Sequence, residues 1–285
     1  MPAAGSQISE PLPDPIDPRG IRERAGIATF EHPAEVSSTM ERARELATDP
    51  DVVLPAAVVA DRQSLGRGRR GACWWQPPGS LAVSIVLDSA AVGLGWSQPQ
   101  PTWSLACGIA LAEALMACEP NLEPRVRWPN DVEVGGRKIA GILVETAPGG
   151  RAIFGVGVNT TGSAAQAPAP LRQRIATFPD AAGRPLAREV LLVEFVPRLA
   201  GLLVEIANDP AALVTRYRPL CGLVGRDVTV FQGFDVGGHG RRITGRCFGI
   251  DSDGALVIET IAGRLHLTSG SLTDPADVWR GAADA

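Results

Sequence analysis

The chain has 285 residues, a length that suits one large domain or two smaller ones. Hydrophobic residues make up 45% of it and charged residues 20%, a composition that allows a packed core and excludes global disorder. The net charge of −4 argues against a chain-wide affinity for nucleic acid or anionic membranes, so any basic site must be local.

The cysteine and histidine content points away from a disulfide framework and from a metal centre. Five cysteines are scattered without a Cys-x-x-Cys pair, and the three histidines are dispersed. This pattern is typical of a reducing compartment, so we expect a cytoplasmic protein. No N-terminal stretch has the plan of a signal peptide, and no apolar run approaches the roughly 18 residues of a membrane span.

The N-terminal region is rich in proline and poor in apolar residues, which predicts a disordered lead-in over residues 1–30. No helix-turn-helix pattern fits before residue 37. Ser38 and Glu41 have the Ser-x-x-Glu spacing of a capping box, and a helix is predicted from there to about Ala47.

The next part of the chain is predicted to form a mixed sheet flanked by helices, within a domain that spans residues 31–220. Short β-rich or apolar runs indicate the strands, and longer apolar or amphipathic runs indicate the helices. The expected strands are 52–60, 81–87, 125–128, 132–134, 138–145 and 152–158. The expected helices are 103–118, which is apolar on all sides and therefore buried, 186–206 and 209–219.

The character of the chain changes near Cys221. From there, short β-rich segments alternate with turns, and Asp251-Ser252-Asp253-Gly254 is a strong hairpin signal. These features predict a small barrel-like domain over residues 221–275, followed by a tail over 276–285. The predicted fold class is therefore α+β. The expected strands of the small domain are 227–231, 242–250, 255–260 and 264–267.

A loop of arginine and glycine follows the 52–60 strand. Gly66-Arg67-Gly68-Arg69-Arg70-Gly71 places three arginines between glycines, with Trp74 shortly after. Glycines let backbone N–H groups approach an anion closely, and the guanidinium fork matches phosphate and carboxylate geometry. A solvated basic turn or a nucleic-acid tract is the alternative, but the position between two strands favours a structured anion site.

A second motif, Arg127-Trp128-Pro129-Asn130-Asp131, precedes a hairpin whose second strand begins near Lys138. Lys138 is at the start of an apolar strand, where an anionic ligand could compensate its charge. A lysine at a hairpin edge with its ammonium in water is the alternative. Asn130 and Asp131 could form an ordinary Asx-type turn, or they could offer polar groups to a ligand.

Taken in order, these motifs resemble the biotin protein ligases, in the monofunctional type without an N-terminal DNA-binding domain. The order is a Ser-Thr helix start, a glutamine, the arginine–glycine loop, Trp-Pro-Asn-Asp, Arg-Lys-Ile-Ala-Gly and Gly-Val-Gly-Val-Asn. The resemblance covers about residues 30 to 275. It implies a class II synthetase-like catalytic domain, as in biotin and lipoate ligases, and an SH3-like C-terminal barrel.

The resemblance also implies the activity. Biotin would be activated by ATP and Mg²⁺ to biotinyl-5′-AMP and then transferred to a lysine of the biotin carboxyl carrier domain of a carboxylase of the acetyl-CoA carboxylase type. No nucleic acid or membrane partner is expected. Charge stabilisation by cations suits the joining of two anions and needs no acid–base histidine.

Site residues follow from the resemblance position by position, with Arg69 and Lys138 expected to be catalytic. The biotin-binding set would be Ser38, Thr39, Met40, Gln63, Arg67, Gly68, Arg69 and Lys138. The set on the ATP, adenylate or acceptor side would be Arg70, Trp74, Asn130, Asp131, Gly141 and Asn159. No metal ligand is assigned.

The chain departs from the family pattern in four places. Met40 stands where asparagine is usual, Leu65 replaces alanine, and Arg127 replaces lysine. Ala72 replaces a basic residue just after the arginine–glycine loop, which predicts faster escape of the intermediate.

Two rival functions remain open. A lipoate or octanoate ligase or transferase would share the fold but lack the paired motifs. A non-catalytic biotin-binding paralogue would bind without turnover. A nucleic-acid binder is disfavoured by the acidic chain and by the absence of interleaved aromatic residues.

Overall fold

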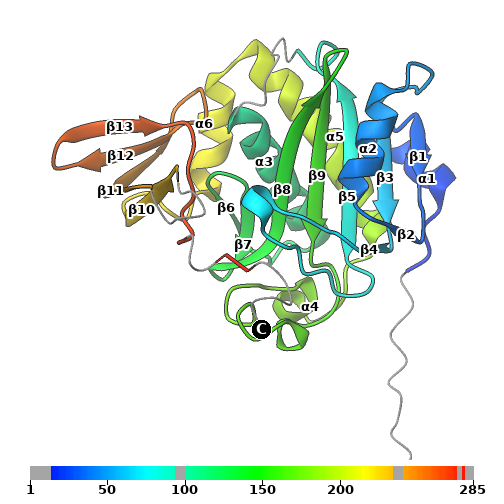
Figure 1. The fold of residues 1–285 in the computed structure, drawn as a ribbon, viewed down its shortest axis with the longest axis horizontal. Helices are drawn as coiled ribbons and strands as arrows, with labels where there is room; N and C mark the ends of the chain where they lie inside the picture. The colour runs from blue at the N-terminus through cyan, green and yellow to red at the C-terminus, as the bar shows by residue number, and fades with distance from the viewer. Residues whose placement is uncertain (1–13, 94–100, 234–239, 275–277, 280–285) are drawn as a thin grey trace, which may run out of the picture.

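A seven-stranded mixed sheet forms the centre of the computed structural model, which describes residues 14–93, 101–233, 240–274 and 278–279 (Figure 1). Strands β1 and β3 are parallel, and each of the other neighbouring pairs is antiparallel. The mixed sheet of the sequence analysis is thus confirmed. In spatial order the strands are β1 (Thr29–Glu31), β3 (Ala56–Ala60), β5 (Leu81–Asp88), β9 (Arg151–Val158), β8 (Arg137–Ala147), β7 (Asp131–Val134) and β6 (Pro124–Arg127).

Helices cover both faces of this sheet (Figure 1). Side chains alternate between the faces of a strand, so Val83 and Ile85 of β5 join the large core while Ser84 and Val86 point the other way. The large core lies under α3 (Pro101–Cys118) and α5 (Arg188–Asn208), and the smaller one lies under α2 (Thr39–Thr48). Apart from α1 (Pro18–Ala25), the other helical segments of the described residues are α4 (Phe178–Ala182), α6 (Ala211–Tyr217), η1 (Arg69–Gly71), η2 (Ala164–Gln166) and η3 (Arg218–Leu220).

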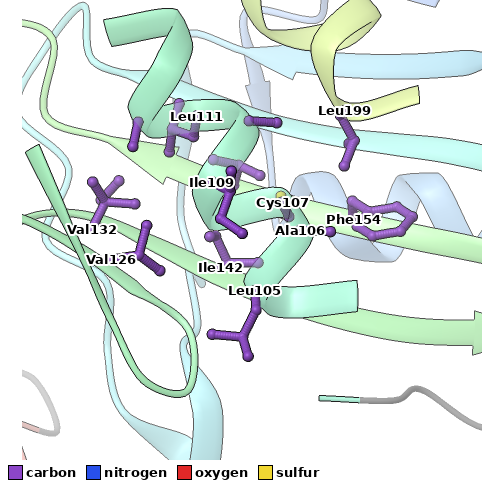
Figure 2. Packing of buried hydrophobic residues seen from close by; sticks show 14 of the residues in the cluster. Leu105, Ala106, Cys107, Ile109, Leu111, Val126, Val132, Ile142, Phe154 and Leu199 are labelled. Carbon is purple, nitrogen blue, oxygen red and sulfur yellow. The ribbon is translucent and has the colours of Figure 1, made fainter. Parts of the chain in front are cut away.

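Helix α3 is the central core helix, as its apolar sequence predicted. Its side chains Leu105 and Ile109 lie among Val126 and Ile142 from the sheet, and Leu199 of α5 approaches from above (Figure 2). The expectation that no apolar run reaches membrane-spanning length is wrong for this helix. Among the described residues, α3 alone is long and apolar enough, with 18 residues and a mean hydropathy of 1.3, but 61% of that stretch is buried inside the protein.

A second, four-stranded antiparallel sheet follows in the last part of the chain (Figure 1). Its strands appear where the sequence predicted them, and Gly254 takes the positive φ of 75° that its hairpin turn requires. The indole Nε1 of Trp128 donates to the Gly254 carbonyl at 3.1 Å and so joins this sheet to the end of β6. The strands are β10 (Asp227–Gln232), β11 (Arg241–Ile250), β12 (Leu256–Thr260) and β13 (Gly263–Leu267).

The predicted disordered lead-in is wrong from residue 14 onward; residues 1–13 lie outside the described part of the chain. Helix α1 spans Pro18–Ala25, with Asp17 as its N-cap and Pro18 in its first turn. Proline is tolerated at that position, so it begins this helix instead of preventing it. Ile21 and Ala25 are buried, so this helix packs against the rest of the protein, a contact that composition alone does not predict.

Two very short strands also escaped the sequence analysis. Strands β2 (Glu35–Val36) and β4 (Arg62–Gln63) pair in parallel just before the arginine–glycine loop. Each strand is only two residues long, which is too short to show the alternation of apolar and polar residues that predicts a strand. They bring the start of α2 beside Gln63. Of the predicted tail over residues 276–285, only residues 278–279 are described.

Candidate active site

Three glycines form a flat patch on the face of the sheet that carries α2. Gly155 and Gly157 lie on β9, and Gly141 of β8 pairs with Gly157. A Cβ atom at Gly155 would meet Met40 Sδ at 2.5 Å, and one at Gly157 would meet Trp74 Cε2 at 2.5 Å. The absence of side chains at these glycines therefore lets Met40 and Trp74 lie directly on the sheet.

The start of α2 and Gln63 form a polar cluster beside this patch. Gln63 Oε1 accepts from the Thr39 backbone N–H at 2.9 Å and from the Thr39 hydroxyl at 3.2 Å. Ser84 of β5, which is fully buried, donates its hydroxyl to Thr39 Oγ1 at 2.9 Å. The structure thus brings Ser38, Thr39, Met40 and Gln63 together.

The predicted helix start is confirmed, but its capping box is not. Ser38 is the N-cap, and its hydroxyl accepts from the Met40 N–H, not from the third helical residue. The Glu41 carboxylate accepts from the Ser37 hydroxyl and does not return to the cap. The Gln63 side chain takes the place of Glu41, because its Oε1 accepts from the Thr39 N–H, one of the free N–H groups of the first helical turn.

The arginine–glycine loop folds back on itself. Trp74 N–H donates to the Gly66 carbonyl at 3.1 Å, and Gly68 N–H donates to the Ala72 carbonyl at 2.7 Å. Gly71 has a φ of 75°, a conformation that favours glycine. The loop is thus a closed structured turn, with Arg67 exposed. Arg70 lies in η1, and its side chain is outside the described set.

Arg69 links this loop to the Trp-Pro-Asn-Asp motif. Its Nη1 donates to Asn130 Oδ1 at 3.0 Å, and Asn130 Nδ2 donates to the Ile142 carbonyl at 2.8 Å. The Ile142 N–H in turn donates to the Asn130 carbonyl at 2.9 Å, and the Trp128–Pro129 bond is cis. Asn130 is therefore fixed on β8, where it holds the guanidinium of Arg69.

Lys138 lies on the same side of the sheet. Its Nζ is 2.7 Å from Asp131 Oδ1 and 5.7 Å from the centroid of the Trp74 ring, and its side chain is 33% exposed. Its aliphatic stem passes over Gly141, where a Cβ atom would meet Lys138 Cε at 3.0 Å. The ammonium is therefore partly exposed and paired with a carboxylate. This environment is intermediate between the two that the sequence left open, a lysine paired with an anionic ligand and a lysine in water at a hairpin edge.

Asn159 has a different environment from the other predicted residues. It is 1% exposed, its N–H donates to the Ile139 carbonyl, and its Nδ2 donates to the Ala176 carbonyl at 2.9 Å. Residues 174–176 run beside Lys138, whose backbone N–H and carbonyl pair with Arg174 and Ala176. In this structure Asn159 therefore anchors the segment that supports Lys138.

A buried ionic network lies behind the polar cluster. The Arg188 guanidinium, with no exposed side-chain surface, bonds Asp61 at 2.6 Å and Asp14 at 2.8 Å, and His32 lies 2.9 Å from Asp61. Burial by itself would raise the pKa of Asp61, but the bonds from Arg188 and His32 outweigh it and hold that pKa below its usual value. Asp61 is therefore a stable anion close to Gln63.

Two residues of the site had no signal in the sequence analysis. Ser84 lies in an apolar strand, and Gln76 follows the two tryptophans after the loop. Only their contacts with Thr39 and Gln63 reveal them. Within the described ranges, no group of three or more His, Cys, Asp or Glu side chains is arranged to hold a metal ion.

The arrangement as a whole offers an anion site. The cations Arg69 and Lys138 both contact the Trp-Pro-Asn-Asp turn, and Lys138 also lies near Trp74, which covers the glycine patch. Each cation is held by one of two consecutive residues, Asn130 and Asp131. Such a site can take a ligand with a polar head and an anionic end, and it can stabilise charge that develops between two anions.

Known proteins are similar to this chain in sequence and in fold. Residues 32–159 match the model of the biotin/lipoate A/B protein ligase family. The chain is 39% identical over 135 residues to the biotin–[acetyl-CoA-carboxylase] ligase of Paracoccus denitrificans, a match that covers 46% of this chain and 54% of that protein. The chain thus spans about half the length of this relative.

A second relative matches over nearly its full length. The biotin–[acetyl-CoA-carboxylase] ligase of Mycobacterium tuberculosis is 28% identical over 273 residues, which cover 90% of this chain and 95% of that protein. Among solved structures, the biotin protein ligase of Aquifex aeolicus in complex with biotin and ATP superimposes with a TM-score of 0.73 at 25% identity, covering 86% of this chain and 97% of that one.

Proposed function

Because residues 32–159 match the model of the biotin/lipoate A/B protein ligase family, we propose that the chain is an ATP-dependent ligase that activates biotin and attaches it to a carrier protein. Its first product would be biotinyl-5′-AMP, and its final product a biotin carboxyl carrier domain with biotin on one lysine. The observation that carries this proposal is that two consecutive residues, Asn130 and Asp131, hold the cations Arg69 and Lys138, in a structure that also forms the Thr39–Gln63 cluster.

The binding roles follow from what each region offers. The cluster of Ser38, Thr39 and Gln63 would bind the polar head of biotin, and the glycine patch with Met40 and Trp74 would bind its apolar part. The carboxylate end would then reach Lys138 and Arg69. Gly68 would contribute backbone contacts, with Arg67 and Arg70 on the phosphate side.

In the first step, a biotin carboxylate oxygen attacks the α-phosphorus of ATP, and pyrophosphate leaves. The new bond is a mixed anhydride, and the broken bond is the link between the α- and β-phosphates. Two anions must approach each other, so Arg69 and Lys138 stabilise the charge that builds on the oxygens. Mg²⁺ enters with ATP as part of the substrate and neutralises phosphate charge.

In the second step, a lysine amine of the carrier attacks the acyl carbon of the anhydride. An amide bond forms, AMP leaves, and the amine loses a proton to solvent or to a nearby base. Asn130 and Asp131 would lie on the side from which the acceptor lysine enters. Closure of the arginine–glycine loop would keep water from the anhydride in the meantime.

The carrier would be a biotin carboxyl carrier domain, since two relatives are named as ligases of acetyl-CoA carboxylase. We place the reaction in the cytoplasm on the cysteine pattern of the sequence. Residues 31–220 would form the catalytic domain, and residues 221–275 would form a smaller unit that packs on it through Trp128.

Pyrophosphate release tests the first step directly. The full chain is incubated with ATP and Mg²⁺ and with biotin, lipoate or octanoate in separate reactions. We expect release with biotin only. Release with lipoate or octanoate alone would instead assign the chain to the sister activity, and tight biotin binding without release would make it a binding protein.

A further inference from the structure

Gln76 lies directly behind the proposed head-group site, although no motif marks it. Its Oε1 accepts from Gln63 Nε2 at 3.4 Å, and its Nε2 donates to the carbonyls of Asp61 at 3.3 Å and Ser80 at 3.4 Å. Ser80 is fully buried. Gln76 therefore connects Gln63 to the backbone at the end of β3 and at the start of β5.

The two ends of this chain of hydrogen bonds fix its direction. At one end the Thr39 backbone N–H can only donate, so the atom of Gln63 that faces it must be the oxygen. At the other end the carbonyls of Asp61 and Ser80 can only accept, so Gln76 must present its NH₂ group to them. Both amide orientations are thus determined by backbone groups, and they agree with each other.

The same reasoning sets which polar groups remain for a ligand. Gln63 uses both acceptor positions of Oε1 on Thr39, and it uses one of its two N–H bonds on Gln76. Thr39 donates its hydroxyl to Gln63 and accepts from Ser84. One N–H of Gln63 and one lone pair of Thr39 are left, a donor next to an acceptor.

We propose that Gln76 is a positioning residue that holds the Gln63 amide so that the site offers a donor and an acceptor side by side. A cyclic urea, with a carbonyl oxygen between two N–H groups, is the complement of this pair. The proposal rests on the proposed function, because biotin carries such a group. It deepens that function by assigning head-group selectivity to a residue outside the loop and the Trp-Pro-Asn-Asp motif.

Gly66 contributes to the same arrangement. A Cβ atom at this position would lie 3.3 Å from Gln63 Nε2 and 3.6 Å from Gln63 Cβ. The first glycine of the arginine–glycine loop therefore leaves room for the Gln63 side chain. Gln63 is consequently enclosed by Gly66 on one side and Gln76 on another, and a flip of its amide would break contacts at both ends.

The test uses Gln76→Met, which keeps the side-chain length and removes all three hydrogen bonds, and Gln76→Glu, which keeps an acceptor for Gln63 but loses the donors. Gln232→Met is the matched control, since Gln232 Nε2 also donates to a backbone carbonyl, that of Ser269, but in the C-terminal sheet. For each full-length variant, the KM values for biotin and ATP, kcat for pyrophosphate release and the melting temperature are measured.

We expect Gln76→Met to raise the biotin KM by about tenfold, the size of effect that a lost hydrogen bond supplies, with the ATP KM within about twofold of wild type. Gln76→Glu should raise the biotin KM less, and Gln232→Met should leave it unchanged. A cyclic guanidine analogue of biotin, which offers donors in place of the carbonyl oxygen, should be rejected less strongly by Gln76→Met than by the wild type.

An unchanged biotin KM in Gln76→Met would overturn the proposal. So would a parallel loss of kcat, ATP affinity and melting temperature, because that pattern indicates a structural role alone. If Gln76→Met does not fold, an unchanged biotin KM and unchanged analogue discrimination in Gln76→Glu would overturn it equally. Failure of the wild type to release pyrophosphate with biotin would instead refute the proposed function, independently of Gln76.

Discussion

The Lys138 ammonium lies 2.7 Å from Asp131 Oδ1, while Arg69 donates to the preceding residue, Asn130. The Trp-Pro-Asn-Asp turn therefore holds both candidate catalytic cations, although the three segments are far apart in the sequence. Asp131 balances the lysine charge, and an incoming anion could take over part of that role. This geometry brings residues of all three motifs together.

Replacement of Lys138 should affect chemistry more than folding. Lys138→Met should lower kcat for pyrophosphate release by about 10²- to 10³-fold, because a positioned charge is lost where negative charge develops. Single-turnover kinetics with biotin and ATP would measure it. Arg137→Met, which changes the neighbouring cation, should stay close to wild type. Equal rates for Lys138→Met and wild type would exclude Lys138 from catalysis.

Arg69 and Asn130 should act as a unit. Either Arg69→Met or Asn130→Ala alone breaks the 3.0 Å bond between them, so the second substitution should cost less once the first is present. A double-mutant cycle on kcat/KM for biotin measures this coupling, for which we expect about 1 kcal/mol. Strict additivity would show that the contact has no functional consequence.

Much of the sheet was predictable, because its central strands are long apolar runs and the glycine pair after β7 marks the hairpin. Helix α1 was not predictable, because the prolines around it indicated disorder. Its two buried residues, Ile21 and Ala25, can be recognised only from their packing against other elements. Strands β2 and β4 were too short to show a period. The motifs located the two cations, but the loop closure that joins Arg69 to Asn130 is a tertiary contact, and Gln76 lies in no motif.

Biotin binding should depend on the space that Gly157 leaves above the strand. Gly157→Ala places a methyl group 2.5 Å from the Trp74 ring and must displace either the indole or the strand. We expect a change in tryptophan fluorescence and a biotin affinity lower by at least about tenfold, since overpacking costs about 1–3 kcal/mol. Gly183→Ala, at a helix end with open space around it but a strained φ of 72°, provides a stability-matched control that should bind biotin normally.

The Asp61–Arg188 pair predicts a pH-dependent stability. The pKa of Asp61 is lower in the folded protein than in the unfolded chain, so its contribution is complete above the unfolded value and is lost as the pH falls through the folded value. Asp61→Asn should cost about 3 kcal/mol at pH 7, because Arg188 stays buried with less compensation. Urea unfolding at several pH values would show the gap between the two proteins closing below about pH 4.

The matching control is Asp253→Asn, in an exposed hairpin turn. Its stability should differ little from wild type at any pH in the same series. A gap for Asp61→Asn that stays constant from pH 7 to pH 3 would contradict the assigned role of the carboxylate charge.

Ala72 should make the intermediate escape faster. Ala72 directly follows the arginine–glycine loop, where the motif that the sequence resembles has a basic residue. Under the proposed function we therefore expect one cation fewer beside the adenylate. Ala72→Arg should therefore lengthen the lifetime of enzyme-bound biotinyl-5′-AMP, measured by a chase with unlabelled biotin and ATP. Equal lifetimes in the two proteins would refute this interpretation of Ala72.

The transfer of biotin to a carrier domain can be observed by intact-protein mass spectrometry. The wild-type chain is incubated with biotin, ATP, Mg²⁺ and a biotin carboxyl carrier domain, alongside a carrier whose target lysine is replaced by arginine. We predict one biotinyl group on the natural carrier, none on the arginine variant, and none on either when Lys138→Met replaces the wild type over the same time. An unmodified natural carrier, in a reaction where biotin is bound, would contradict the ligase function.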